Sequence, residues 1–347
     1  MKRILVTGGS GFIGSHTSIN LLQKDYEVVI VDSFINSSRF FYERIKNLAK
    51  RIDSNLLRRI ILFEGDIRDK NLLEGIFRKS INEGKRIEGV IHFAGLKAVA
   101  ESLKEPSKYW DFNFIGTFRL IEVMEKYECR TLIFSSSATV YGCSKDFLIT
   151  ESAIVNPINP YGHTKAAVEN FLKNIYDSQP DKWRIACLRY FNPIGAHSTG
   201  MIGENPNGMP NNIFPFINQV AIGKIERLEI FGNDWETSDG TCIRDYIHVM
   251  DLAEGHILSL EFLFENECRF INLNLGTGIG TSVLELVNIF QEVNKVKVPF
   301  IYTDRRVGDV ARIVADNGFA LSILNWKPTK TINEMCKDGW KWQQVKG

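Results

Sequence analysis

The sequence predicts a doubly wound α/β protein, in which helices cover both faces of a parallel β-sheet. Short apolar segments alternate with longer amphipathic segments as far as about residue 190, and this alternation is typical of parallel strands joined by right-handed helical crossovers. A glycine-rich turn directly follows the first apolar segment. We therefore expect the ligand-binding loops at the carboxyl edge of one large sheet.

The apolar segments expected to form this sheet leave room for a helix between successive strands. They are residues 4–6, 28–31, 60–63, 89–93, 131–135 and 185–190. After residue 192 the chain becomes rich in Gly, Pro and Asn as far as residue 212, which predicts a long loop into a smaller α/β lobe. In that lobe we expect helices near 215–223, 251–264 and 283–293, and a strand at 270–275 that rejoins the large sheet.

The turn after the first strand has the spacing Gly-x-x-Gly-x-x-Gly, formed by Gly8, Gly11 and Gly14, and a helix begins at about Phe12. Glycines here permit a tight turn and a close approach of the backbone to a pyrophosphate, at a helix N-terminus. The second strand ends in Asp32, 24 residues after Gly8. A carboxylate at this place binds an adenosine ribose diol and repels a 2′-phosphate, so NAD is favoured over NADP. These signals predict a Rossmann-type NAD-binding domain at 1–191 and a substrate lobe formed mainly by 192–347.

Tyr161 and Lys165 lie four residues apart on a segment that reads as a helix. This spacing places both side chains on one face, one turn apart. A free phenol titrates near pH 10. A lysine ammonium at about 6 Å favours the phenolate by roughly two pK units, and a second positive charge, such as an oxidised nicotinamide, would lower the pKa further. The spacing alone occurs on many solvated helices, and its meaning here comes from the nucleotide site before it.

The bulk composition describes an ordinary globular chain. Its 347 residues are 44% hydrophobic and carry a formal net charge of +1, which does not suggest a nucleic-acid or membrane partner. No apolar run is long enough to span a bilayer. The six cysteines are scattered without a Cys-x-x-Cys pair, and the six histidines show no metal-ligand spacing. We expect reduced thiols, no metal site and a cytoplasmic location.

Four stretches carry a resemblance to a known family. They are His-Phe-Ala-Gly-Leu-Lys at 92–97, Phe-Ser-Ser-Ser-Ala-Thr-Val-Tyr-Gly at 134–142, Arg-Tyr-Phe-Asn-Pro at 189–193 and Arg-Asp-Tyr-Ile-His-Val-Met-Asp at 244–251. With the glycine turn and the Tyr/Lys pair, they make the chain resemble the extended short-chain dehydrogenases/reductases. Within these it is most similar to the UDP-glucose 4-epimerases, and the resemblance covers nearly the whole chain.

The resemblance implies an isomerase that interconverts UDP-galactose and UDP-glucose through a transient 4-keto sugar, with bound NAD. Tyr161 would be the catalytic base, Lys165 its electrostatic partner and a ligand of the nicotinamide ribose, and Ser137 a hydrogen-bonding group that relays the 4-hydroxyl proton. The cofactor-binding set implied is Gly8, Gly11, Phe12, Ile13, Gly14, Asp32, Asn36, Ser37, Asp66, Ile67, Phe93, Ala94, Gly95, Lys97, Asn113, Ser137, Tyr161, Lys165 and Phe191.

The resemblance also implies a substrate site, and a homodimer that pairs through the long helices flanking Asn113 and Tyr161. The UDP-hexose would be held by Lys97, Ser137, Tyr161, Asn192, Asn212, Ile213, Glu229, Ile230, Phe231, Arg244, Arg306, Asp309 and Ile313. Taken singly, arginines such as Arg244 and Arg306 are more often solvated or paired with a neighbouring carboxylate.

Three alternatives remain open from the sequence. Isoleucine at 313 is intermediate between the bulky and the small residues found at the matching family position, so an enzyme that also accepts UDP-N-acetylglucosamine is an alternative, and Arg312 could be the lining residue instead. Sugar-nucleotide dehydratases and decarboxylases share the fold, but the dehydratases carry an Asp-Glu pair where this chain has Ala138 and Thr139. A non-catalytic NAD-binding regulator is disfavoured because Tyr161, Lys165 and Ser137 are all present.

Overall fold

A seven-stranded parallel sheet forms the centre of the molecule, as predicted. The computed structural model describes residues 1–144, 146–206, 210, 212–306 and 308–346. The strands run in the order β10-β6-β5-β4-β1-β2-β3, and every neighbouring pair is parallel. Their bounds are β1 (Arg3–Thr7), β2 (Glu27–Asp32), β3 (Ile60–Glu64), β4 (Ile87–His92), β5 (Thr131–Ser135), β6 (Arg184–Tyr190) and β10 (Arg269–Leu275).

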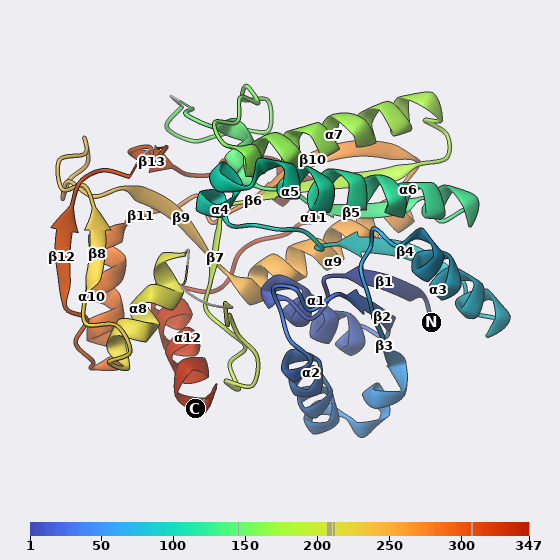
Figure 1. Cartoon of the computed structure of the whole chain (residues 1–347), viewed down its shortest axis with the longest axis horizontal. Coiled ribbons are helices and arrows are strands. Elements are labelled where there is room, and N and C mark those ends of the chain that lie inside the picture. Colours follow the sequence, from blue (N-terminus) through green and yellow to red (C-terminus); the bar gives the residue numbers. More distant parts are fainter. Residues whose placement is uncertain (145, 207–209, 211, 307, 347) are drawn as a thin grey trace.

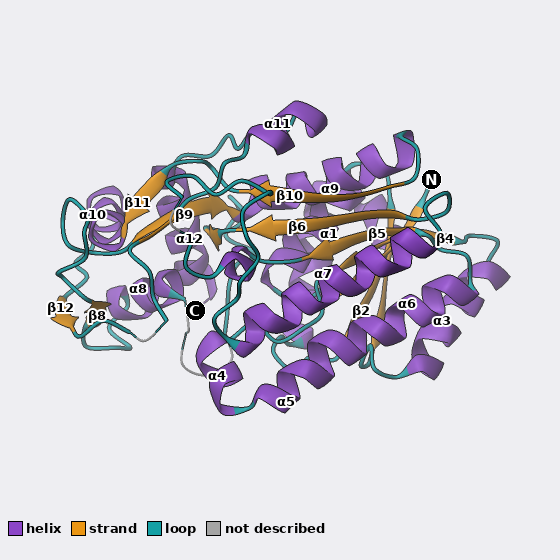
Figure 2. Cartoon of the chain, turned by 90° about the horizontal axis from the view of Figure 1, so that it is seen from above, coloured by secondary structure: helices purple, strands orange, loops and turns teal. Residues whose placement is uncertain are grey.

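Helices cover both faces of this sheet, because successive buried residues of each strand point to opposite sides. On β1, Ile4 and Val6 pack in one hydrophobic cluster and Leu5 in another. The first cluster includes side chains of α1 (Phe12–Gln23), α2 (Arg39–Ile52), α9 (Val249–Glu265) and α11 (Gly318–Leu324). The second includes side chains of α3 (Lys70–Asn82), α6 (Gly116–Lys126) and α7 (Pro160–Ser178). Figures 1 and 2 show these two layers on either side of the strands.

A smaller lobe lies at one end of the sheet, on the left in Figure 1. Its strands are β7 (Asn192–Ile194), β8 (Leu228–Phe231), β9 (Ile243–His248), β11 (Gly280–Ser282), β12 (Phe300–Thr303) and β13 (Arg312–Ile313). Strand β9 pairs with β7, β11 and β13, and β8 pairs with β12. The helices α8 (Ile213–Ala221), α10 (Val283–Asn294) and α12 (Ile332–Lys346) supply residues of the same lobe, and its own apolar cluster includes Phe214, Phe290 and Met335.

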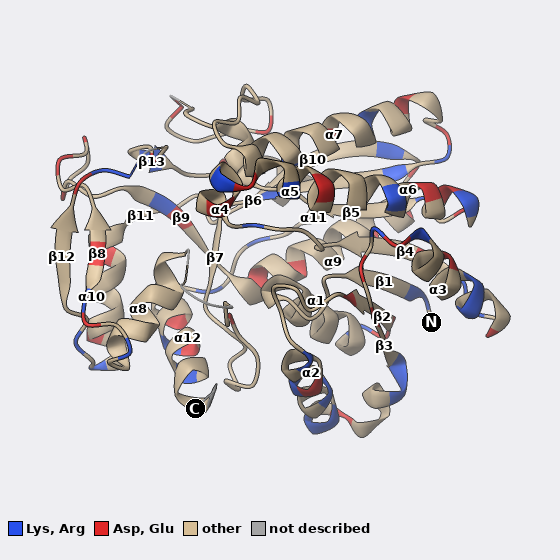
Figure 3. Ribbon diagram, in the orientation of Figure 1, with Lys and Arg blue, Asp and Glu red and all other residues tan. Residues whose placement is uncertain are grey.

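The remaining elements are short; those after β4 and β5 follow the carboxyl ends of these strands, whereas the 3₁₀-helix Ser54–Arg59 leads into the amino end of β3. These short elements are α4 (Val99–Lys104), α5 (Pro106–Tyr109), a π-helix (Trp110–Ile115) and two 3₁₀-helices (Ser54–Arg59 and Ala138–Tyr141). The loop predicted at 192–212 begins with β7, and residues 207–209 and 211 of it lie outside the described residues. Charges of both signs are intermixed over the helices (Figure 3). Among the described residues, no helix combines the length and the apolar character needed to cross a membrane.

Candidate active site

The glycine-rich turn between β1 and α1 leaves space that side chains would fill. Gly8 has φ +67°, and a Cβ atom there would lie 2.8 Å from the backbone nitrogen of Ala94. A Cβ atom at Gly14 would collide with the carbonyl oxygen of Gly8. Gly11 is the N-cap residue of α1, and no side chain at this position caps the first backbone N–H groups of the helix. The turn therefore presents backbone N–H groups at a helix N-terminus, which is the arrangement that binds a pyrophosphate.

Asp32 ends β2 beside this turn, and its carboxylate is fixed by three donors. Oδ2 accepts a hydrogen bond from the backbone N–H of Ser10 at 2.9 Å. Oδ1 accepts bonds from the backbone N–H of Phe34 at 2.9 Å and from the Ser37 hydroxyl at 2.8 Å. Burial raises the pKa of Asp32, and these three hydrogen bonds oppose that rise. The carboxylate is thus held in one orientation at the edge of the cleft, with lone pairs left for a ribose diol.

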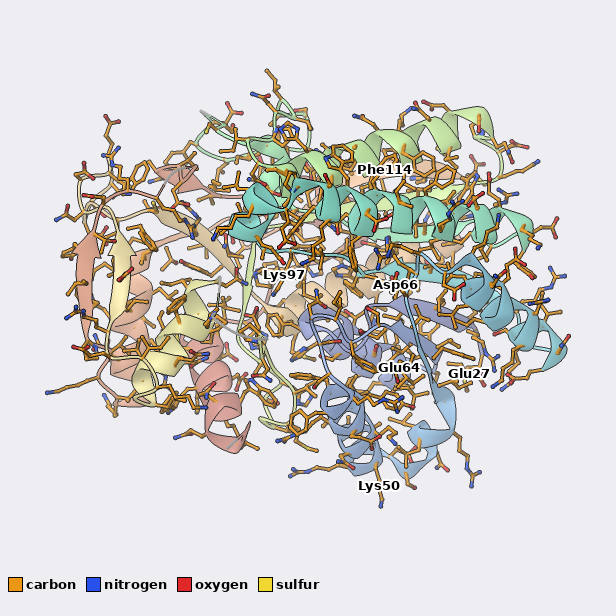
Figure 4. All side chains as sticks on the ribbon, viewed as in Figure 1. Glu27, Lys50, Glu64, Asp66, Lys97 and Phe114 are labelled. Carbon is orange, nitrogen blue, oxygen red and sulfur yellow. The ribbon has the colours of Figure 1, made fainter. Side chains whose placement is uncertain are left out.

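A cleft is lined by the glycine turn and, farther along, by Tyr161, Lys165 and Tyr190. A second hollow shares Gly8, Asp32 and Ala94 with it and extends to Asp66. Together they are lined by nearly all of the predicted cofactor residues, namely Gly8, Gly11, Phe12, Ile13, Gly14, Asp32, Asn36, Ser37, Asp66, Ile67, Phe93, Ala94, Gly95, Lys97, Tyr161 and Lys165. Figure 4 labels Lys97, beside the small lobe, and Asp66, on the side of the large sheet.

At the Asp66 end of the cleft, the side chains of Asp66 and Asn36 form hydrogen bonds within the protein. The carboxylate of Asp66 accepts hydrogen bonds from the Arg68 guanidinium at 2.6 and 3.0 Å and from the Arg68 backbone at 2.9 Å. Burial raises the pKa of Asp66, but the bonds from Arg68 outweigh it and leave the pKa lowered. The Asn36 side chain donates a hydrogen bond to the Gly95 carbonyl oxygen at 3.2 Å, and both residues line the cleft.

Tyr161 and Lys165 lie on the first turns of α7, and both are buried. The ammonium nitrogen of Lys165 lies 5.9 Å from the Tyr161 ring centroid and donates a hydrogen bond to the Ser135 carbonyl oxygen at 2.7 Å. Helix α7 begins here because Pro160 occupies its first turn and the Asn159 side chain accepts a bond from the backbone of Gly162. The pair is therefore set one helical turn apart, at the separation that the sequence predicts.

The electrostatics of this pair differ from the sequence estimate in one respect. Burial lowers the pKa of Lys165 to about 8, and Glu169 partly counters this fall. Burial also raises the pKa of Tyr161, and a hydrogen bond with Ser137 acts in the opposite direction. The phenol is therefore not made acidic by its surroundings in the protein, because burial is the largest influence on its pKa and raises it. A further positive charge is needed beside the ring.

Ser137 lies at the end of β5, where its hydroxyl oxygen is the N-cap of the 3₁₀-helix Ala138–Tyr141. It accepts bonds from the Thr139 backbone at 3.2 Å and the Thr139 hydroxyl at 3.0 Å. Since both acceptor positions of Ser137 are used, its own proton is directed outward, toward the phenol of Tyr161. The cap expected of a serine after a strand and the proposed catalytic role are thus compatible.

Asn113 does not line the cleft, and the structure gives it a positioning contact instead. Its side-chain oxygen accepts from the Leu96 backbone at 2.8 Å, and its nitrogen donates to the Leu96 carbonyl oxygen at 3.1 Å and to the Thr164 hydroxyl at 3.0 Å. It belongs to the π-helix Trp110–Ile115, a kind of distortion that often occurs near functional sites. Asn113 therefore fastens the loop after β4 to α7.

Two arginines of the small lobe converge on one carboxylate. Asp309 lies 2.9 Å from Arg306 and 3.6 Å from Arg244. The Arg244 guanidinium is further fixed by the carbonyl oxygens of Ile243 and Val310, at 2.9 and 2.8 Å. The buried Asp245 does not pair with Arg244 and instead accepts bonds from residues 277, 278 and 315. Two fixed guanidinium groups side by side are suited to a diphosphate.

The other predicted substrate residues differ in whether their side chains are exposed or packed in the core of the small lobe. On β8, Glu229 and Phe231 face outward, with the Arg306 guanidinium 5.5 Å from the Phe231 ring, whereas the Ile230 side chain is only 1% exposed. Ile230 therefore packs in the apolar cluster of the lobe, and its side chain cannot contact a uracil. The described position of Ile213 is the first residue of α8, and it packs against the same cluster. Asn192 starts β7, and Phe191 just before it is buried.

Strand β13 distinguishes between Ile313 and Arg312. Ile313 packs against a cluster that contains Ala138, next to Ser137, and Phe191. The guanidinium of Arg312 instead stacks on the ring of Phe147, 4.2 Å from its centroid. Because neighbouring residues of a strand point to opposite sides, Ile313 is the residue on the side of Ser137.

Several cleft residues were not predicted. Tyr190 lines the cleft beside Tyr161, and its hydroxyl shares a 2.8 Å hydrogen bond with the Ser135 hydroxyl. Glu204 also lines the cleft and forms a 2.7 Å ion pair with Lys97. Ser10, Leu96, Phe112 and Phe41 are among the other lining residues. Tyr190 belongs to the 189–193 stretch that carries the resemblance, which was the available signal; Glu204 stands in no motif. Among the described residues, no group of three His, Cys, Asp or Glu side chains is arranged to hold a metal ion.

Comparison with known proteins places these features among nucleotide-sugar enzymes. A family model described as GDP-mannose 4,6 dehydratase matches residues 5–339. A UDP-glucose 4-epimerase of Bacillus subtilis is 47% identical over 340 residues, which are 98% of this chain and 96% of that protein. The crystal structure of a UDP-glucose 4-epimerase from Stenotrophomonas maltophila, with bound NAD and formylated UDP-arabinopyranose, superposes with a TM-score of 0.93 at 43% identity and covers 100% of this chain and 99% of its own. The enzyme of that name from Bifidobacterium longum, in complex with NAD⁺ and UDP, gives 0.91 at 40% identity, with 99% and 98% covered.

Proposed function

We propose that this chain, which belongs to the family of UDP-glucose 4-epimerases, interconverts UDP-galactose and UDP-glucose by inverting C4 of the hexose. The observation that carries this proposal is the meeting of Tyr161 and Lys165 at the end of a cleft that starts at a glycine-rich helix N-terminus. Ala138 and Thr139 follow the catalytic serine and offer no acid/base pair for elimination at C5 and C6. This favours epimerisation over a dehydratase reaction.

The cleft fits NAD on the evidence of its own residues. The space at Gly8 and Gly14 that a Cβ atom would fill admits a pyrophosphate close to the backbone, and the fixed carboxylate of Asp32 suits an unphosphorylated ribose. When bound in its oxidised form, NAD supplies a positive charge beside the phenol and accepts, then returns, the hydride of the sugar C4. Lys165 would bind the nicotinamide ribose, and Lys97 would lie near the pyrophosphate.

Tyr161 is the proposed base for the sugar 4-hydroxyl. Burial raises the pKa of its phenol, and the hydrogen bond with Ser137 acts in the opposite direction; the positive charge of an oxidised nicotinamide would favour the phenolate further. The phenolate takes the 4-hydroxyl proton directly or through the Ser137 hydroxyl. Loss of this proton, together with loss of the C4 hydride that bound NAD would accept, converts the 4-hydroxyl carbon to a ketone. When the keto sugar has rotated and presents its opposite face to the cofactor site, Tyr161 returns the proton to the oxygen on C4. Lys165 remains cationic at neutral pH, because its pKa is lowered only to about 8.

The turning of the sugar requires that the nucleotide be held more firmly than the hexose. Arg244 and Arg306 are proposed to bind the diphosphate, and their pairing with Asp309 holds them in place before substrate arrives. The outward side chains of Glu229 and Phe231 are proposed to lie along the uracil. Ile313 is proposed to limit the space at the C2 substituent, so UDP-N-acetylglucosamine would be a weaker substrate.

We also propose a homodimer that pairs through α6, α7 and the π-helix before α6. This face carries linked aromatic rings, Trp110 on Phe114 and Phe114 on Phe171, and Trp110 and Ile115 are each 40% exposed. Light scattering on the purified protein would give the mass of two chains. The six free cysteines favour a reducing compartment, and the cytoplasm is our proposed location.

The proposed function is tested by incubating the purified protein with UDP-galactose, without added NAD, and separating the products. Formation of UDP-glucose to an equilibrium mixture is expected. Release of a 4-keto-6-deoxy sugar, or no conversion by a protein that contains NAD, would contradict the proposal. A parallel assay with UDP-N-acetylgalactosamine and UDP-galacturonate defines the substrate range.

A further inference from the structure

Glu204 lies between the two halves of the proposed site and joins them. It belongs to the loop between β7 and α8, and its side chain is only 8% exposed. One carboxylate oxygen, Oε1, accepts a hydrogen bond from the Lys97 ammonium at 2.7 Å and from the Asn212 side chain at 3.2 Å. Lys97 follows β4 on the cofactor side, and Asn212 is the N-cap of α8 on the substrate side.

The position of Glu204 is fixed by the C-terminal helix. The Trp342 indole donates a hydrogen bond to the Glu204 carbonyl oxygen at 2.8 Å. The same indole is almost fully buried, and its ring packs on Phe41, which lines the cleft from α2. A Cβ atom at Gly203 would collide with the Trp342 ring, so the backbone before Glu204 lies directly against α12. The carboxylate is therefore presented to the cleft by a rigid support.

The ion pair spans the cleft. Lys97 and Glu204 are 107 residues apart in sequence, and both line the hollow that contains the glycine turn and Tyr161. The Lys97 side chain is 55% exposed, so this contact lies toward the open side of the cleft. The second carboxylate oxygen of Glu204 is buried and accepts no hydrogen bond from the described residues. It can accept a donor that enters with a ligand.

We propose that Glu204 is a positioning residue. Its ion pair with Lys97 across the cleft, here called the clasp, retains NAD between turnovers. This inference rests on the proposed function, since it concerns the cofactor of the same site. The shared oxygen also links the clasp to Asn212, so a substrate diphosphate that binds beside Asn212 acts on the same contact. A clasp of this kind lowers the rate of cofactor release without taking part in the proton or hydride transfer.

The test compares Glu204→Gln with a matched control, Glu74→Gln. Glu74 also pairs with a lysine at 2.7 Å, Lys126, but it lies on α3, outside the cleft. The glutamine keeps the shape of the side chain and removes the charge. The measured quantity is the rate at which NAD leaves the purified holoenzyme, followed by trapping the released NAD with an excess of an NAD-consuming dehydrogenase.

Glu204→Gln is expected to raise the release rate about five- to tenfold, because a charge-assisted hydrogen bond becomes a neutral one. Glu74→Gln should leave the rate unchanged. In a double-mutant cycle with Lys97→Met, the two changes should not add fully, since both act on the same charge-assisted contact. Saturating NAD should restore most of the kcat of Glu204→Gln.

An unchanged release rate in Glu204→Gln would overturn the proposal, as would fully additive effects in the cycle. So would a variant that loses thermal stability while NAD release stays as in the wild type, because that is the result of a purely structural role. If the wild-type protein fails to epimerise UDP-galactose yet the Glu204 variant releases NAD faster, the clasp stands and the proposed function fails. The two claims are thus separated by different readouts.

Discussion

Replacing Lys165 by methionine tests whether a buried positive charge is retained for function at the expense of stability. The Lys165 side chain is 5% exposed, and its ammonium contacts the Ser135 carbonyl oxygen and lies 4.8 Å from the Phe134 ring centroid. Burial lowers its pKa from the ordinary 10.5 to about 8. Methionine fills nearly the same volume without the charge, so Lys165→Met isolates the electrostatic cost.

The size of the expected change in the free energy of unfolding follows from the lowered pKa of Lys165. A fall from 10.5 to about 8 corresponds to about 3 kcal/mol of destabilisation at pH 7. The variant loses the hydrogen bond to Ser135, which offsets about 1–2 kcal/mol of that gain. We therefore expect Lys165→Met to raise the free energy of unfolding by about 1–2 kcal/mol at pH 7, while epimerase activity falls about a hundredfold or more.

The pH dependence gives the sign of the effect independently. Below pH 8 the lysine is protonated in both the folded and the unfolded chain, so its full cost is present. Between pH 8 and 10.5 the unfolded chain binds more protons than the folded one, and the stability of the wild type rises with pH. The advantage of the variant should therefore shrink from pH 7 to pH 10.

The assay is urea denaturation of nucleotide-free wild type and variant at pH 7, 8.5 and 10, because bound NAD would add its own stabilisation. Lys173→Met is the matched control, since Lys173 lies on the same helix but is exposed and forms an ion pair with Asp177 at the surface. It should change stability by less than about 0.5 kcal/mol at each pH. The reasoning is refuted if Lys165→Met is less stable than the wild type at pH 7, or if the difference between them does not change with pH.

Three further predictions concern the fold and the specificity of the site. Glu169→Gln should destabilise the protein by about 3–5 kcal/mol in urea denaturation, because it breaks a buried ion pair with Arg189 and leaves that guanidinium unpaired; a loss below about 1 kcal/mol would show that the pair is replaceable. Asp32→Ser should weaken NADH binding about tenfold and bring NADPH binding closer to it, measured by fluorescence titration, since the carboxylate that repels a 2′-phosphate is gone; an unchanged ratio would count against that role. Ile313→Tyr should lower turnover of UDP-N-acetylglucosamine relative to UDP-glucose about tenfold or more, and an unaltered ratio in a two-substrate assay would remove Ile313 from the C2 pocket.

Much of the fold follows from local sequence. The six apolar segments expected in the large sheet are strands β1 to β6 of the structure, because their length, their β-branched residues and the intervening helices leave few other arrangements. The short strands of the small lobe were not predicted. Pairs such as β8 with β12 and β7 with β9 bring together segments far apart in the chain, and two- to four-residue strands carry too little periodicity to recognise.

The properties of the site also divide into those that local sequence predicts and those that it does not. The glycine turn, Asp32 and the Tyr161–Lys165 spacing are local patterns, so their place in the cleft could be predicted. Burial could not, and it raises the pKa of Tyr161, whereas the spacing of the pair predicts a lowered one.

Tertiary contacts set the roles of the residues that the sequence left unassigned or assigned differently. The role proposed for Glu204 rests on its contact with Lys97, 107 residues away in the sequence. Asn113 is drawn away from the cleft by its bonds to Leu96 and Thr164. Side chains alternate between the exposed and the buried side of β8, and this alternation buries Ile230. The burial of Ile230 could be predicted only if the strand itself had been predicted.

The most direct test of the central claim uses UDP-galactose with deuterium at C4 of the hexose. If C4 is oxidised and reduced again within one active site, the UDP-glucose formed keeps its deuterium at C4, and Tyr161→Phe forms product at least a hundredfold more slowly. Loss of the label to solvent during conversion, or an undiminished rate in Tyr161→Phe, would contradict the account.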